Sequence, residues 1–136
     1  MPNFAYLKSK KAEQEMSAIT IRKVATRRDL RHFIDFHYDL YEGNSYDVPT
    51  LYSDDFRTLS KDQNPAFEFC EAEYFLAYRE GRIVGRVAAI INHKANERWQ
   101  RESVRFGWID MIDDVEVTRA LLDAVADYGR QKGMKE

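Results

Sequence analysis

Two runs of strand-forming residues around Glu80 and Gly81 constrain the fold of this chain most strongly. The first run is EAEYFLAYR and the second is RIVGRVAAIINH. Runs of this kind on either side of a short turn containing glycine are typical of a β-hairpin. The second run is apolar enough to be a central strand, and Gly85 inside it indicates a β-bulge or a close approach of another backbone.

Before the hairpin, the pattern predicts one strand and two helices. Residues 18–24, AITIRKV, alternate apolar and polar side chains as a strand does. Thr26 followed by Asp29 is a helix start signal, apolar residues at helical spacing follow, and Gly43-Asn44 ends that helix. A second, short helix is expected over residues 51–59.

After the hairpin, a connector precedes a further strand and a long amphipathic helix. The strand is SVRFGWIDMI, in which Val104, Phe106 and Trp108 are expected on one face. The helix ends at Gly133. Its apolar side is formed by Val117, Ala120, Leu121, Ala124, Val125 and Tyr128.

Composition indicates a single globular domain and excludes some classes of function. The chain has 136 residues, of which 44% are hydrophobic and 13% aromatic, enough to form a core. With a net charge of -2 and no one-sided basic stripe, it is not expected to bind nucleic acid. It has no apolar run long enough to cross a bilayer and no signal-peptide pattern, so no membrane association and a cytoplasmic location are expected. The single cysteine, Cys70, is expected to be a packing residue.

No metal site is expected from the sequence. The three histidines share no metal-like spacing with one another or with Cys70, and the two acidic pairs lack the ligand series of a calcium loop. The histidines are His32, His37 and His93, and the acidic pairs are Asp54-Asp55 and Asp113-Asp114. His37 falls on the apolar side of the first helix, which favours a hydrogen-bonded core histidine.

The expected order β-α-α-β-β-β-α resembles the GNAT superfamily of acyl-CoA N-acyltransferases. The resemblance is carried by TIRKV (20–24), FLAYREGRIVGRVAAI (75–90) and TRALLDAVADYGRQKGMK (118–135). It implies an α+β fold with a mixed, mainly antiparallel sheet flanked by helices, truncated after the last helix. Residues 1–17 are then an N-terminal extension, and residues 18–136 form the front part of one GNAT-like domain. The open sheet edge is a place where two copies can pair as a homodimer.

The resemblance also implies a co-substrate, acetyl-CoA or another acyl-CoA, and a small-molecule amine as acceptor. Family members usually carry Q/R-x-x-G-x-G/A before the last helix, where backbone N–H groups hold the coenzyme pyrophosphate. Here Asp113 takes the Gln/Arg position, and Glu116 and Thr118 take the glycine positions. The carboxylates of Asp113 and Glu116 repel a phosphate, so we expect this chain to bind acetyl-CoA weakly or not at all. Asp113 is expected instead to cap the helix, with Glu116 as its partner.

Individual site residues follow from the same resemblance. Asp110 is the candidate base, the alternative being a solvated residue at a strand end. Tyr41, Tyr46 and Tyr52 are candidates for the acceptor site, or for packing against the sheet. The candidate coenzyme residues are Phe106, Gly107, Trp108, Ile109, Met111, Asp113, Asp114, Val115, Glu116 and Thr118.

Three functional hypotheses remain open from the sequence. The first is an acyl-CoA-dependent N-acyltransferase homologue that transfers an acyl group to an unknown amine, with this chain inactive alone. The second is a non-catalytic GNAT-like module that binds a ligand or a partner. The third is an unrelated α+β interaction domain.

Overall fold

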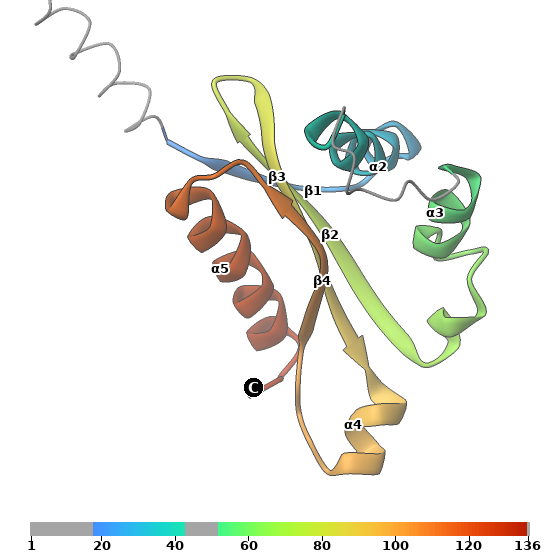
Figure 1. The fold of residues 1–136 in the computed structure, drawn as a ribbon. Coiled ribbons are helices and arrows are strands. Elements are labelled where there is room, and N and C mark those ends of the chain that lie inside the picture. The colour runs from blue at the N-terminus through green and yellow to red at the C-terminus, as the bar shows by residue number, and fades with distance from the viewer. Residues whose placement is uncertain (1–17, 43–51, 136) are drawn as a thin grey trace, which may run out of the picture.

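The computed structural model describes residues 18–42 and 52–135, and these form an α+β fold (Figure 1). The strands make one four-stranded sheet in the order β1-β2-β3-β4, and every pair of neighbours is antiparallel. The elements are β1 (Thr20–Lys23), α2 (Arg27–Leu40), α3 (Tyr52–Leu59), the 3-10 helix η1 (Pro65–Glu68), β2 (Cys70–Arg79), β3 (Arg82–Asn92), α4 (His93–Trp99), β4 (Arg105–Met111) and α5 (Val115–Gln131). The expected α+β class and strand order are confirmed, whereas the expected N-terminal extension, residues 1–17, lies outside the described residues.

The sheet has a hydrophobic core on each face. Figure 1 shows α5 on one side of the sheet and α2 with α3 on the other. The core beneath α5 includes Phe75, Val87, Ile91, Val117 and Leu121. The core beneath α2 and α3 includes Leu30, Phe33, Ile34, Leu59, Tyr74 and Leu76. Strands β2 and β3 are therefore covered on both faces, which explains their nearly continuous apolar sequence.

The hairpin turn and the bulge expected at Gly85 are both present. Glu80 and Gly81 have φ of 51° and 78°, as a tight turn between two strands requires. Ala77 pairs with Gly85, while the next residue, Tyr78, pairs with Ile83, so β3 has one residue more than β2 at this point. The bulge lies at the centre of the sheet, beneath α5.

The two long helices begin at caps, one of which was expected correctly. At α2, the Thr26 side chain accepts from the Asp29 N–H and the Asp29 side chain accepts from the Thr26 N–H, which completes the expected capping box. At α5, the expectation that Asp113 is the cap is wrong. Asp114 is the cap, and its carboxylate accepts from the Glu116 N–H at 2.9 Å. The helix starts one residue later than the D-x-x-E spacing predicts, so Asp113 is left exposed.

A bulge in β4 contradicts the expectation that Val104, Phe106 and Trp108 share one face. Val104 packs against the core beneath α5, and Trp108 packs against the core beneath α2. Phe106 is 57% exposed. Trp108 has a φ of 50°, and the pairing of β4 with β3 shifts register across this residue. The regular alternation of side chains therefore breaks between Gly107 and Asp110.

Strands β1 and β4 each pair with one neighbour within the described residues, so they form the two edges of this sheet. Pairing of two copies through such an edge remains a prediction. No helix in residues 18–42 or 52–135 combines the length and the apolar character needed to cross a bilayer.

Replacing Gly85 with alanine should destabilise the fold. A Cβ at this position would lie 2.9 Å from Leu121 Cδ1 and 2.9 Å from Val117 Cγ1. We expect Gly85→Ala to cost about 1–3 kcal/mol of unfolding free energy, because α5 must move away from the sheet. Chemical denaturation measures this loss.

Gly107→Ala is the matched control for this experiment. A Cβ at Gly107 meets only Ile90 Cδ1, at 3.8 Å, which is an ordinary contact. The Gly107→Ala variant should keep the stability of the wild type. Equal stabilities for the two variants would contradict the close packing of α5 on Gly85.

Candidate functional site

A buried arginine lies at the centre of the candidate site. Arg86 belongs to β3 and is 4% exposed, on the face covered by α2. Its Nη1 donates to the carbonyl oxygen of Phe33 at 2.8 Å, and its guanidinium lies 5.0 Å from the Phe33 ring and 5.6 Å from the Trp108 ring. Burial lowers the pKa of Arg86, and the neighbouring Asp110 carboxylate opposes that shift. Such a group needs a close anionic partner to remain charged.

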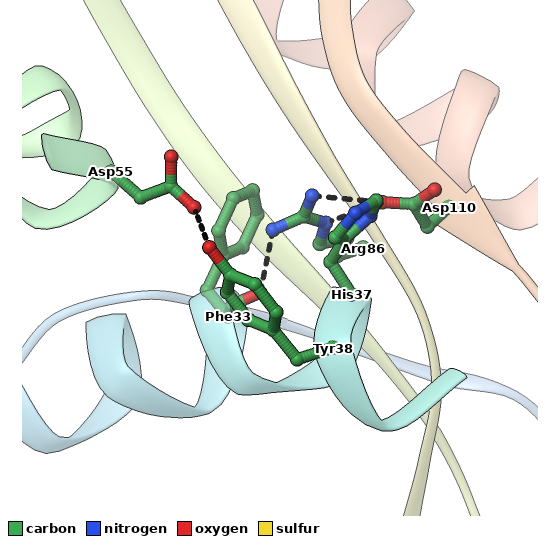
Figure 2. A network of polar contacts seen from close by, with 6 residues as sticks. All are labelled: Phe33, His37, Tyr38, Asp55, Arg86 and Asp110. Carbon is green, nitrogen blue, oxygen red and sulfur yellow. Dashed lines mark hydrogen bonds and ion pairs between the residues drawn. The ribbon is translucent and has the colours of Figure 1, made fainter. Parts of the chain in front are cut away.

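Asp110 supplies that negative charge and joins Arg86 to a histidine. Its Oδ2 accepts from Arg86 Nε at 2.8 Å, lies 2.8 Å from Arg86 Nη2, and lies 3.0 Å from Nδ1 of His37 (Figure 2). Asp110 is 9% exposed, so the expected alternative of a solvated strand-end residue is wrong. His37 is hydrogen-bonded as expected, and its side chain is 26% exposed. The three side chains therefore form a continuous Arg–Asp–His chain from the sheet to α2.

The bulge in β4 is what places Asp110 on this face. Gly107 pairs with Ala88, and Asp110 pairs with Arg86. Between these two pairs, β4 advances by three residues while β3 advances by two. Ala88 and Arg86 point to the same face, because they are two residues apart in a strand. Without the extra residue at the bulge, Asp110 would point toward α5 instead.

An open pocket of about 430 Å³ lies beside this chain of side chains. It is lined by His37, Asp55, Arg86, Trp108, Ile109 and Asp110. Asp55 comes from α3 and is 7% exposed, and its Oδ2 accepts from the Tyr38 hydroxyl at 2.8 Å. The pocket thus brings acidic, basic and aromatic side chains from α2, α3, β3 and β4 to one place.

The structure divides the predicted site residues into separate groups. Trp108, Ile109 and Asp110 line the pocket, and the ring of Tyr41 lies 4.9 Å from that of His37. Phe106 is on the other face, and Met111 packs into the core beneath α5. Tyr46 and the side chain of Tyr52 lie outside the described part of the chain.

The remaining candidates surround the start of α5. The exposed residues there are Asp113, Val115 and Glu116, while Gly107, Asp114 and Thr118 are partly buried. Arg79 Nη1 donates to Asp114 Oδ2 at 2.6 Å, and Arg79 Nε and Nη2 are buried with no hydrogen-bond partner in the described residues. The Arg79 guanidinium and the Glu116 N–H together hold the pKa of Asp114 below its ordinary value of 3.8. At this turn, Asp114 therefore already caps the start of α5, and the carboxylates of Asp113 and Glu116 are exposed.

Within residues 18–42 and 52–135, no group of three or more His, Cys, Asp and Glu side chains is arranged to hold a metal ion. The described pocket residues include His37, Asp55, Arg86 and Asp110, which can supply acid–base chemistry and charge.

Sequence reasoning missed Arg86 and Asp55 and assigned His37 only to the core. One signal for Arg86 was available, because a charged residue in the middle of an apolar strand needs a buried partner. Asp110, in the next apolar strand, is that partner. The pairing itself could not be read from spacing, because His37 and Asp110 are 73 residues apart.

Comparison with known proteins gives two relatives among curated sequences. The chain is 32% identical to Protein YghO of Escherichia coli over 113 residues, which is 83% of this chain and 29% of that protein. It is 30% identical to the bacterial ceramide synthase of Caulobacter vibrioides over 116 residues, which is 85% of this chain and 30% of that protein. The chain thus spans about three-tenths of the length of either relative. No family model and no solved structure matches it.

Replacing Asp114 with asparagine should destabilise the protein near neutral pH and not in acid. Asparagine can still cap the helix but loses the ion pair with Arg79. Because the pKa of Asp114 is lowered in the folded state, its contribution is present above 3.8 and is lost as the pH falls through the folded-state pKa. Thermal melting should therefore show a gap between wild type and Asp114→Asn at about pH 6 that closes toward about pH 2.

The matched control is Asp113→Asn at the neighbouring exposed position. Its melting temperature should stay close to that of the wild type at each pH. A gap for Asp114→Asn that is independent of pH would mean that the ion pair contributes nothing.

Proposed function

We propose that this chain forms part of a GNAT-like N-acyltransferase that joins an acyl group from an acyl-CoA to an amine. The observation that carries the proposal is the pocket beside β4, where the Arg86–Asp110–His37 chain ends at a partly exposed imidazole. Two other observations support it, namely the order of the elements and the name of one relative.

The order of elements supports the fold part of the proposal. In the GNAT superfamily, which the order of elements resembles, the strand that precedes the long helix lies beside the thioester. Here that strand is β4, and its bulge removes Trp108 and Ile109 from the regular pairing with β3. Backbone groups freed from a ladder can bind a ligand instead.

The relative named bacterial ceramide synthase supports the reaction part. A ceramide is an amide formed between a long-chain amine and a fatty acyl group. We infer by this likeness that the present chain belongs to an amide-forming protein whose acceptor is a primary amine.

The chemistry needs a base, because an alkylamine is mostly protonated at neutral pH and has no nucleophilic lone pair in that form. We assign the hydrogen between His37 and Asp110 to His37 Nδ1, so that the imidazole donates to the carboxylate. In this tautomer the basic lone pair is on Nε2. His37 then accepts the proton of the amine, and Asp110, held by Arg86, orients the ring and stabilises its charged form.

The reaction then balances as an acyl transfer. The amine nitrogen attacks the acyl carbonyl carbon, a C–N bond forms, and the C–S bond of the thioester breaks. The ammonium gives up two protons in all. His37 takes the first, which frees the nitrogen lone pair for attack. The second leaves the nitrogen after the C–N bond has formed and passes to the departing thiolate, which becomes a thiol.

The start of α5 does not fit the pyrophosphate of coenzyme A. Residues 113–118 contain no glycine, the Glu116 N–H already donates to Asp114, and Asp113 and Glu116 are exposed carboxylates. No step of this proposal therefore uses a phosphate contact at this turn. The same feature favours a second candidate, a GNAT-like module that binds an amine in the pocket and transfers nothing.

Substituting His37 should remove acyl transfer. We expect His37→Gln to lower kcat by about 10²–10⁴-fold, the usual contribution of a positioned acid–base group. The measurement is amide formation from an acyl-CoA and a long-chain primary amine by the natural gene product, followed by mass spectrometry. His32→Gln, on the same helix, is the control and should keep wild-type activity.

Three measurements separate the possible roles. Loss of activity in Asp110→Asn with full activity in His37→Gln would make Asp110 the base and would contradict the role given to His37. Nitrogen-15 NMR of the His37 ring should show the Nδ1–H form in the wild type and a mixture of tautomers in Asp110→Asn. A folded wild-type protein that forms no amide with any acyl donor would support the binding module.

A further inference from the structure

We propose that a second pocket of the protein binds an amphipathic carboxylate, that is, an apolar chain that ends in a carboxylate group. The pocket has a volume of about 300 Å³ and lies between the first turn of α2 and the end of α3. Arg27 in this pocket and His37 in the pocket beside β4 are ten positions apart on α2, which is about 15 Å along the helix axis. The inference therefore goes beyond the proposed function and does not depend on it.

The floor of this second pocket is apolar. It is formed by the buried side chains of Leu30, Leu59 and Tyr74 and by the partly buried side chains of Val24 and Phe56. All five belong to or pack against the hydrophobic core beneath α2 and α3, so packing holds them in place. A pocket of this volume is at the lower end of the range typical of small-molecule sites. A hydrocarbon chain as short as that of octanoate therefore matches the floor in size and in polarity.

Two cations lie over aromatic rings of this floor. The Arg27 guanidinium lies 5.0 Å from the centre of the Phe56 ring, and the Lys61 ammonium lies 5.6 Å from the centre of the Tyr74 ring. Both cations belong to exposed residues that line the pocket. A cation that lies over a ring keeps N–H donors that point away from that ring. Arg27 and Lys61 can thus donate to a carboxylate while the rings beneath them contact the chain that carries it.

The choice of a carboxylate follows from these donors and not from the net charge of the lining. Asp62 also lines the pocket, and its carboxylate repels an anion placed beside it. The head group of the ligand is therefore assigned to Arg27 and Lys61. Hydrogen bonds from a cation to a carboxylate are stronger than those to a hydroxyl, so a carboxylate should bind here more tightly than an alcohol with the same chain.

Hydrogen bonds fix the walls around the floor. The Tyr74 hydroxyl donates to the Leu59 carbonyl at 2.8 Å, and the Ser60 hydroxyl donates to the Phe56 carbonyl at 2.6 Å. The Val24 N–H donates to the Tyr74 carbonyl at 2.8 Å. The end of α3 and the segment before α2 are thus both tied to β2. A pocket whose walls are already ordered loses little conformational entropy when a ligand fills it.

The test compares octanoate with octanol, two probes of the same chain length, by calorimetry on the natural gene product at neutral pH and low salt. We expect octanoate to bind at least about tenfold more tightly than octanol. Arg27→Gln and Lys61→Gln should each weaken octanoate binding by about fivefold, and the double variant should bind both probes equally. Arg28→Gln is the matched control and should keep wild-type affinity, because it removes the same charge from an exposed neighbour outside the described lining.

Four results would overturn the inference: no binding of octanoate, equal affinities for the two probes in the wild type, a preserved preference in the double variant, or an equal loss of affinity in Arg28→Gln. Thermal melting checks that the variants are folded.

Methyl NMR of the wild type is a second measurement that needs no substitution. Octanoate should shift the methyl signals of Leu30 and Leu59 and leave those of Ile109, in the pocket beside β4, unchanged. Shifts at Ile109 without shifts at the two leucines would place the ligand in the other pocket and contradict the inference. Neither experiment contains an acyl donor or an amine, so its failure is distinct from failure of the proposed function.

Discussion

The buried guanidinium of Arg86 is the interaction on which the described structure depends most. Arg86 is a residue of β3, and its side chain donates to the Phe33 carbonyl in α2 and binds Asp110 in β4. This one side chain therefore joins three elements that are far apart in sequence. A buried cation without these partners would cost several kcal/mol. The position of α2 over the sheet, and with it the position of His37, therefore follows from how Arg86 is satisfied.

The bulge in β4 is the second half of the same arrangement. It adds one residue between Gly107 and Asp110, which turns the carboxylate toward Arg86 and brings Trp108 onto the same face. The backbone of Trp108 has a φ of 50°, a conformation that a bulky side chain adopts only where the surroundings enforce it. Strain and buried charge thus meet at one pocket, as they commonly do where a protein binds or reacts.

Sequence patterns predicted correctly those features of the fold that depend on residues close together in the chain. The turn at Glu80-Gly81, the capping box at Thr26 and the buried face of α5 depend on residues close in sequence, and all three are present. The face of Trp108 was predicted wrongly because strict alternation cannot foresee an extra residue. The cap of α5 was predicted at Asp113, but the cap is Asp114. Either aspartate could cap the helix by the local pattern, and Arg79, 35 residues away, contacts Asp114. The pocket depends on pairings between residues that are 17 to 73 positions apart, which no motif records.

A double-mutant cycle between Arg86 and Asp110 tests this account most directly. Arg86→Met and Asp110→Asn should each lower the unfolding free energy by about 3–5 kcal/mol, because each leaves one buried charge without its partner. The double variant should lose less than the sum of the two by at least about 1.5 kcal/mol, because neither charge remains. Losses that add within about 0.5 kcal/mol would show that the two residues stabilise the fold independently, and would contradict the account.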